Sequence, residues 1–172
     1  MTDPPDHPDF PLPPGLSGPR RATIEDVPAI VGLLVDDLLG SGRESSDRAH
    51  LAPYLTAFAA IDADPAHLLL VVDDDGDHNG DGGEVVATLQ LTFVPGLSRG
   101  GALRAQIEAV RVARSHRGSG LGAALVSWAV AEAERRGCAL VQLTTDKQRG
   151  DAHRFYERLG FVATHEGFKR QL

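Results

Sequence analysis

Apolar residues recur every three or four positions in four segments of the chain. This spacing places them on one face of a helix, so each segment predicts an amphipathic helix packed against a core. Thr23 and Asp26 form a helix-start pattern at the first segment, and Pro28 stands in its first turn, where a missing N–H is tolerated. The predicted helices cover residues 23–40, 51–58, 121–136 and 152–159.

Elsewhere, apolar residues either run together or alternate with polar ones, as they do in strands. Residues 84–94 alternate most regularly, which predicts a strand with one apolar face. The helix at 121–136 joins two predicted strands, an order that makes a right-handed parallel crossover. The predicted strands lie near Arg20 and at residues 67–72, 84–94, 103–112, 138–145, 161–163 and 167–172.

The predicted strand at 103–112 changes the side to which its apolar residues point. They occupy odd positions as far as Ala109 and even positions from Val110 onward. A regular pleat sends alternate residues to opposite faces, so this switch predicts a β-bulge. A bulge bends the strand away from its neighbour and frees backbone groups, so an extended ligand could hydrogen-bond there.

The same strand runs into a glycine-rich loop with the pattern Arg117-x-x-Gly120-x-Gly122. The first N–H groups of the following helix are unpaired and the helix dipole is positive at this end, so the loop predicts a phosphate site. The spacing is neither that of a Walker loop nor that of a dinucleotide-binding fingerprint. The arginines that make this region locally basic are Arg111, Arg114 and Arg117.

The 172 residues suffice for one domain with its own core. Residues 1–19 hold seven of the eleven prolines, so we expect a disordered or extended tail there, or an arm across a partner subunit, followed by one domain over residues 20–172. The net charge of −7 disfavours a nucleic-acid partner. No apolar run is long enough to predict a membrane span.

The single cysteine, Cys138, excludes an intrachain disulfide and fits a reducing, cytoplasmic location. It opens an apolar run, so we expect a buried strand residue. Residues 73–83 are rich in Asp and Gly, but Val86 stands where a calcium loop needs its final Glu, so we predict a hairpin turn. No two histidines have HExxH spacing, and we predict no metal site.

Two motifs together resemble the GCN5-related N-acetyltransferase (GNAT) family over residues 20–172. The glycine loop is similar to the family's pyrophosphate loop for acetyl-coenzyme A. The segment Ala152-x-x-x-Tyr156-x-x-x-Gly160-Phe161 is similar to a second family motif. The stretch that begins at Asp151, with the later His165, is also similar to aminoalkylphosphonate N-acetyltransferases.

The resemblance implies an α/β (α+β) fold, in which a mixed, mostly antiparallel central sheet is splayed at the middle and flanked by about four helices. It implies an N-acetyltransferase that passes acetyl from acetyl-coenzyme A directly to a primary amine of a small molecule, in a ternary complex. Tyr156 would then protonate the leaving thiolate, and Glu108 would act as a water-mediated base. The backbone N–H near Val110 or Val112 would polarise the thioester carbonyl. The expected cofactor-binding residues are Val110, Arg111, Val112, Arg117, Gly118, Ser119, Gly120, Leu121, Gly122, Asp151 and Arg154.

One position departs from the family pattern, and several alternatives stay open. Arg149 stands where many family members have Asn, so Asp151 or Arg154 would replace a contact to the pantetheine arm. Glu108 could instead be a surface carboxylate or an ion-pair partner of a neighbouring arginine, and Tyr156 could serve only the core. The acceptor could be a protein lysine or N-terminus, or the domain could be a non-catalytic acyl-coenzyme A sensor. A homodimer is an expectation at the level of the family.

Overall fold

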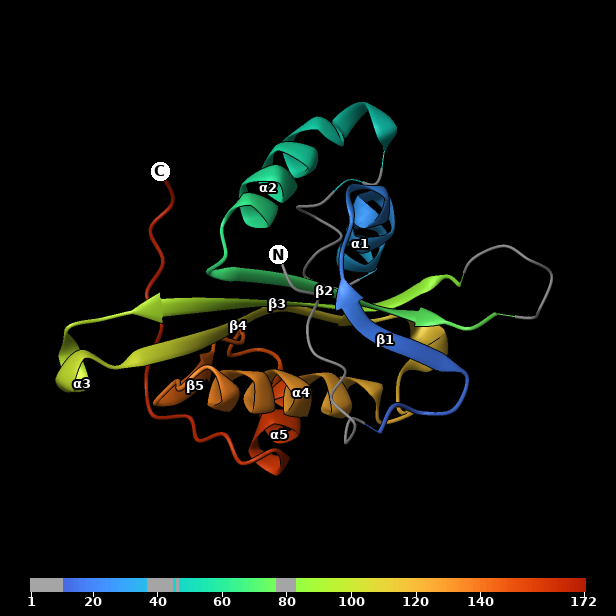
Figure 1. Ribbon diagram of the computed structural model, residues 1–172. Helices are drawn as coiled ribbons and strands as arrows, with labels where there is room; N and C mark the ends of the chain where they lie inside the picture. The colour runs from blue at the N-terminus through green and yellow to red at the C-terminus, as the bar shows by residue number, and fades with distance from the viewer. Residues whose placement is uncertain (1–10, 37–44, 46, 77–82) are drawn as a thin grey trace.

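The centre of the computed structural model is one five-stranded sheet (Figure 1). The model describes residues 11–36, 45, 47–76 and 83–172. Strands lie in sequence order; the first four are antiparallel to their neighbours, and β5 is parallel to β4. The expected mixed, mostly antiparallel sheet is confirmed. The strands are β1 (Leu16–Arg21), β2 (His67–Asp74), β3 (Val85–Pro95), β4 (Leu103–Val112) and β5 (Leu140–Leu143).

Among the described residues, four helices of nine or more residues cover the sheet (Figure 1). α1 and α2 lie on one face, and α4 and α5 lie on the other. The connection from β4 through α4 to β5 is the predicted parallel crossover. α1 ends at Val35, before the predicted end near Gly40; residues 37–44 are outside the described part. The helices are α1 (Val27–Val35), α2 (Ala52–Ala63), the short α3 (Ser98–Gly101), α4 (Leu121–Arg135) and α5 (Gly150–Arg158), with 3-10 turns at Ile24–Asp26, Arg48–His50 and Arg114–His116.

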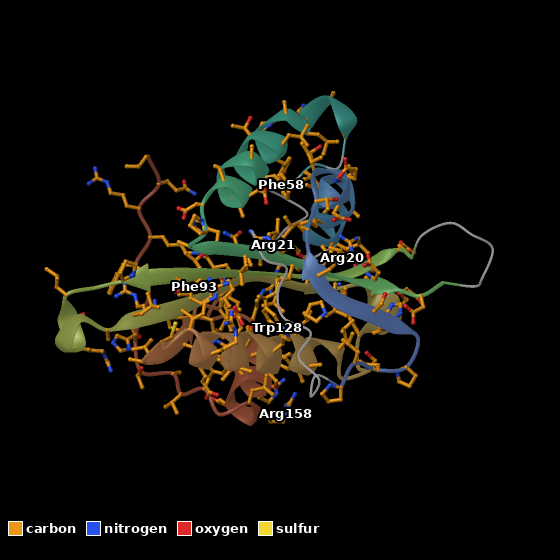
Figure 2. All side chains as sticks on the ribbon, in the orientation of Figure 1. Arg20, Arg21, Phe58, Phe93, Trp128 and Arg158 are labelled. Atoms are coloured by element: carbon orange, nitrogen blue, oxygen red, sulfur yellow. The ribbon has the colours of Figure 1, made fainter. Side chains whose placement is uncertain are left out.

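The core has two parts, one on each face of the sheet. The larger part joins Trp128 of α4 to apolar residues of β2, β3 and β4. The smaller part joins Phe58 of α2 to Val31 of α1 and Val71 of β2. Figure 2 shows Phe58 and Trp128 on opposite sides of the sheet. The central strands therefore bury both faces, and their edges and ends are left for a ligand.

A fully buried carboxylate lies on the core side of α4. Glu132 is 0% exposed and accepts hydrogen bonds at 2.6–2.8 Å from Arg135 and Arg136. Burial by itself raises the pKa of this carboxyl, but the two guanidinium groups outweigh burial and hold the pKa below its usual value. The Arg136 guanidinium also lies 4.1 Å from the ring centroid of Phe93. The periodicity of the sequence did not predict this buried charge.

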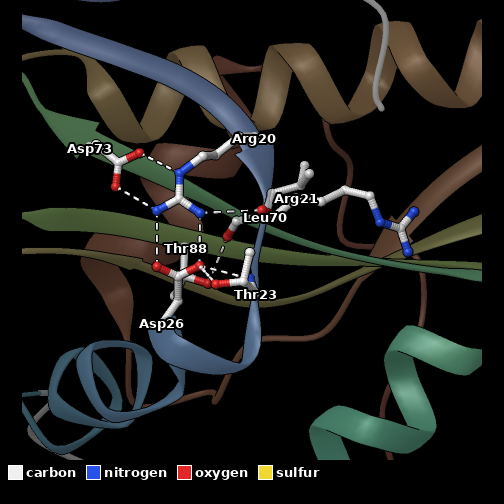
Figure 3. A network of polar contacts seen from close by, with 7 residues as sticks. All are labelled: Arg20, Arg21, Thr23, Asp26, Leu70, Asp73 and Thr88. Carbon is white, nitrogen blue, oxygen red and sulfur yellow. Dashed lines mark hydrogen bonds and ion pairs between the residues drawn. The ribbon is translucent and has the colours of Figure 1, made fainter. Parts of the chain in front are cut away.

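Arg20 joins β1 to the strand beside it and to the start of the first helix (Figure 3). Its guanidinium donates hydrogen bonds to Asp26 at 2.7 and 2.9 Å and to Asp73 at 2.6 and 3.0 Å. Asp26 also accepts the backbone N–H of Thr23 at 2.7 Å, which confirms the capping box predicted at the helix start. The network fixes the entry of α1, whose other end reaches the glycine loop.

The expected boundary of the N-terminal tail was wrong by several residues. β1 begins at Leu16, and both Leu16 and Ser17 pair with β2, so residues 16–19 belong to the domain. The register shifts between Ser17 and Arg20, and Pro19 lies within this irregular stretch of an edge strand. Proline lacks an N–H, so it is tolerated at such a position and does not mark the end of order. Residues 1–10 lie outside the described part.

The two closing strands predicted at 161–163 and 167–172 were also wrong. The structure has no strand among residues 161–172. Val162 is 76% exposed and Phe168 is 93% exposed, so neither side chain gains the burial that a sheet position would supply. Alternation of apolar residues is necessary for a half-buried strand, but it does not provide a pairing partner.

Cys138 lies before a strand and not within one. β5 begins at Leu140, and Cys138 is half-buried against the larger part of the core. Burial raises the pKa of its thiol, so the group is protonated at neutral pH and has the chemistry of a small apolar residue. Residues 77–82 of the predicted Asp- and Gly-rich turn lie outside the described part.

Candidate active site

The sheet opens between β4 and β5, beside a bulge in β4. Pairing of the two strands runs from Arg104 with Leu140 to Ile107 with Leu143, whereas β4 continues to Val112. Two residues of β4 stand opposite one of β3 between the Gln90–Glu108 and Thr88–Arg111 pairs. Ala109 there has φ 53°, a strained backbone region for a residue with a Cβ. The predicted bulge and the predicted splay are both confirmed.

The glycine loop follows β4 directly and leads into the N-terminus of α4. Gly118 and Gly120 have φ of 82° and 93°, a left-handed conformation that glycine adopts without strain. The hydroxyl of Ser119 donates to the carbonyl of His116 at 2.7 Å and accepts the N–H of Leu121 at 3.3 Å. Within the described part of the chain, the N–H groups of Gly118 and Gly120 have no acceptor. The loop therefore presents backbone donors at the positive end of a 15-residue helix.

Two arginines and a histidine of this loop region contact two carboxylates that the sequence analysis did not identify. Carboxylate oxygens of Asp36, directly after α1, lie 2.8 Å from the Arg114 Nε and 2.8 Å from the Arg117 Nη2. The Arg117 Nε donates to the carbonyl of Val112 at 3.0 Å. The Nε2 of His116 lies 3.4 Å from a carboxylate oxygen of Asp74, at the end of β2. Nothing in the local sequence pattern signals these contacts, because the paired residues are distant along the chain.

The two motifs that carried the family resemblance meet at the start of α4. A Cβ placed on Gly122 would lie 3.6 Å from Phe155 of α5 and 3.6 Å from Val112 of β4. Val110 and Val112 pack against the larger part of the core, together with Phe155 and Tyr156. The end of β4, the loop and α5 thus form one wall along the opening of the sheet.

Tyr156 lies half-buried in this wall, between two aromatic rings. Its ring meets those of Phe155 and Phe161 edge to face, with centroids 5.0 and 5.9 Å away. Burial raises the pKa of its phenol, and the positive charges of Arg111 and Arg149 partly oppose that effect. The phenol of Tyr156 is therefore neutral at pH 7, and nearby positive charge would stabilise its phenolate.

Glu108 lies on the opposite face from the α4 core. Ala105 and Ile107 are buried in that core, so the alternating residues of β4 face α1 and α2. Glu108 is exposed there and pairs in register with Gln90. We call the polar residues of this face the acceptor strip: Gln90 and Thr92 of β3, Arg104, Gln106 and Glu108 of β4, and Gln142 of β5.

The acceptor strip is organised by cross-strand contacts. The side-chain amide of Gln142 donates to the side-chain oxygen of Gln106 at 2.7 Å. The Nε of Arg104 is buried and has no hydrogen-bond partner among the described residues. The strip therefore offers amide groups near the carboxylate of Glu108 and one guanidinium further along β4, close to Gly96.

Asp151 and Arg154 are not in the wall. They form an ion pair with each other on the exposed side of α5, while Phe155 and Tyr156 face inward. Arg149 stands at the N-cap of α5, and its charge acts on Tyr156. The charge of Arg149 thus acts on the phenol, whereas Asp151 and Arg154 pair with each other.

Gly120 provides a test of the loop conformation. We expect Gly120→Ala to lower the free energy of unfolding by about 1–2 kcal/mol, because φ 93° is strained for a residue with a Cβ. Gly32 in the interior of α1 has open space around it, so Gly32→Ala should raise the free energy of unfolding by about 0.5–1 kcal/mol. Denaturant unfolding of both variants measures this difference. Destabilisation of the two variants by the same amount would contradict the assigned loop conformation.

Comparisons of this chain with known protein families and structures agree with this geometry. The model of the acetyltransferase (GNAT) family matches residues 33–161, more than half of the chain. The protein therefore belongs to the GNAT family, and it is an N-acetyltransferase of that type. The opening of the sheet, the bulge and the glycine loop all fall within the matched residues. In the part of the chain that the structure describes, no helix has the length and apolarity to cross a membrane.

Three similar proteins are informative. An aminoalkylphosphonate N-acetyltransferase of Salmonella typhimurium is 30% identical over 154 residues, which are 89% of this chain and 90% of the relative. A glucosamine 6-phosphate N-acetyltransferase of Trypanosoma brucei brucei is 38% identical over 81 residues, 47% of this chain and 53% of that relative. The crystal structure of a transcriptional regulator from Bacillus halodurans C-125 superposes with a TM-score of 0.82 at 45% identity, covering 90% of this chain and 99% of that one.

Proposed function

We propose that this protein transfers acetyl from acetyl-coenzyme A to the primary amine of a small molecule that carries a phosphonate or phosphate group. The opening between β4 and β5, beside the glycine loop, is the observation that carries the proposal. The loop residues from Arg117 to Gly122 would bind the pyrophosphate. The pantetheine arm would then run along the free edge of β4 from Val112 towards Glu108, where strand pairing with β5 has ended.

The chemistry needs an amine that is neutral when it attacks. Alkyl amines have a pKa of about 10, so nearly all are protonated at pH 7 and a base must remove a proton. Glu108 would receive that proton through water. The amine nitrogen then attacks the thioester carbon, and backbone N–H groups at the bulge, near Val110 or Val112, would stabilise the oxyanion. As the carbon–sulfur bond breaks, Tyr156 would protonate the coenzyme A thiolate. The nitrogen, positively charged after its attack, would lose its second proton to solvent, and the Tyr156 phenolate would take a proton back from solvent.

Two observations support an anionic acceptor. Both relatives that are named for a substrate act on a small amine that also carries a phosphonate or a phosphate. The acceptor strip contains Arg104, whose buried Nε is unsatisfied among the described residues. A guanidinium binds phosphate and phosphonate oxygens well because its N–H groups match their spacing.

Release of the coenzyme A thiol from acetyl-coenzyme A tests the proposal. The acceptors should be paired: an aminoalkylphosphonate with the corresponding alkyl amine, and glucosamine 6-phosphate with glucosamine. A lysine peptide and a polyamine complete the panel, because protein and polycation acceptors are the alternatives. We expect kcat/KM to be at least about tenfold higher for the anionic member of a pair, the effect of one charge-assisted contact. Equal values within both pairs, or turnover of the peptide alone, would refute the proposed acceptor class.

A further inference from the structure

The arginines of the glycine loop are already bound to an anion of the protein itself. Asp36 forms an ion pair with Arg114 and accepts a hydrogen bond from Arg117, each at 2.8 Å. The backbone carbonyl of Asp36 lies 3.4 Å from the Arg117 Nη2. The carboxylate thus bridges two guanidinium groups much as a phosphate would.

The position of Asp36 strengthens this arrangement. It is the C-cap of α1, where the helix dipole is negative and attracts cations. The other end of α1 is fixed by the contacts of Asp26 with Arg20 and Thr23, so the helix holds Asp36 in place. The Nε of Arg117 is also oriented by the carbonyl of Val112. The cofactor phosphates would therefore meet arginines that are occupied and directed toward α1.

We propose that Asp36 competes with the phosphates of coenzyme A for Arg114 and Arg117, and so limits how tightly the cofactor and its product are held. This inference rests on the proposed function, since it assumes that the loop binds the pyrophosphate. For each arginine that contacts a phosphate, a contact with Asp36 must break, and the negative carboxylate is left beside a negative ligand. The benefit is release of coenzyme A after transfer, a step that limits turnover in many enzymes.

Calorimetric titration with coenzyme A tests the inference on three proteins: the parent, Asp36→Asn and Glu25→Gln. Asp36→Asn keeps the shape of the side chain and removes its charge. Glu25→Gln removes one negative charge from an exposed residue near the opposite end of α1. We expect Asp36→Asn to bind coenzyme A about two- to fivefold more tightly, the range for partly exposed ion pairs, and Glu25→Gln to match the parent. Asp36→Ser should behave like Asp36→Asn and serves as the second variant if the first does not fold.

A second probe separates the phosphate effect from a general change in structure. S-acetylpantetheine carries the thioester and the arm but no pyrophosphate, so its KM should be the same in the parent and in Asp36→Asn. Unchanged or weaker binding of coenzyme A by Asp36→Asn would overturn the inference, since Asp36 would then be neutral or would help to position the arginines. The inference would also be overturned if Asp36→Asn bound coenzyme A more tightly and lowered the KM for S-acetylpantetheine by the same factor. Failure of the parent protein to bind coenzyme A would instead refute the proposed function.

Discussion

Replacement of Tyr156 with Phe is expected to lower kcat by about 10²- to 10³-fold and to leave the KM for acetyl-coenzyme A nearly unchanged. The ring keeps its edge-to-face contacts with Phe155 and Phe161, so the wall of the site stays packed. The hydroxyl alone is lost, and the departing thiolate then has no proton donor from the protein at this position. Steady-state kinetics with acetyl-coenzyme A and the best amine of the panel measure both constants.

The chain offers a matched control, because it contains only one other tyrosine. Tyr54 of α2 accepts a backbone hydrogen bond from Ser45 at 3.3 Å, and we expect Tyr54→Phe to keep kcat within about twofold of the parent. Burial raises the pKa of Tyr156, so its phenol stays protonated at least as far as pH 10. A loss of activity below that pH therefore has another origin. If Tyr156→Phe turned over at the parental rate, Tyr156 would have no part in the mechanism.

Replacement of Arg20 with Leu is expected to lower the free energy of unfolding by about 2 kcal/mol. Its guanidinium lies between the carboxylates of Asp26 and Asp73 and donates hydrogen bonds to both. The side chain of Asp26 is only 9% exposed. Without Arg20, a nearly buried carboxylate loses its cation. The side chain of Arg20 is itself 41% exposed, so solvent screens part of the interaction and the loss stays below that of a fully buried pair.

The neighbouring arginine is the control for this stability effect. Arg21 contacts the carbonyl of His67 at 3.4 Å and lies 3.9 Å from a carboxylate of Asp62 that is half exposed. We expect Arg21→Leu to cost less than about 1 kcal/mol, since no buried charge is left unpaired. Denaturant unfolding at pH 7 compares the two variants. Equal decreases in the free energy of unfolding would show that the contacts of Arg20 with Asp26 and Asp73 contribute no more to stability than the contacts of Arg21.

The pH dependence of the Arg20→Leu effect has a definite sign. Burial raises the pKa of Asp26, but hydrogen bonds from Arg20 and Thr23 outweigh burial and lower the pKa below its unfolded value, which is about 3.9. The native state therefore binds protons less readily, and the stability from this contact is present above about pH 4. It is lost as pH falls through the lower, folded pKa. The difference between the parent and Arg20→Leu should accordingly shrink as pH falls below about 4.

The sequence predicted those features of the fold that depend on local pattern. The parity change after Ala109 predicted the bulge because a bulge is the local solution to such a change. The glycines after Arg117 predicted a loop that presents unpaired backbone N–H groups at the start of the next helix, and the structure adds that Gly118 and Gly120 are left-handed. These two features define the opening of the sheet and the candidate phosphate site.

The sequence did not predict features that depend on distant partners. Asp36 and the loop arginines are about 80 residues apart, and no periodicity connects them. The buried charge of Glu132 was missed for a different reason: its partners Arg135 and Arg136 are close along the chain, but a charged residue on a helix is usually exposed, and packing of α4 on the sheet is what buries it. The strands predicted at 161–163 and 167–172 do not form. Their alternating pattern is suited to a strand, but no neighbouring strand pairs with these residues.

The most direct test of the account is the product formed by the parent protein from acetyl-coenzyme A and an aminoalkylphosphonate. Mass spectrometry of the reaction, together with thiol titration, counts acetylated amine and free coenzyme A. The account predicts one N-acetylated product for each thiol released, and loss of both together in Tyr156→Phe. Thiol release without an acetylated amine, or an acetylated amine formed equally well by Tyr156→Phe, would contradict direct transfer at this site.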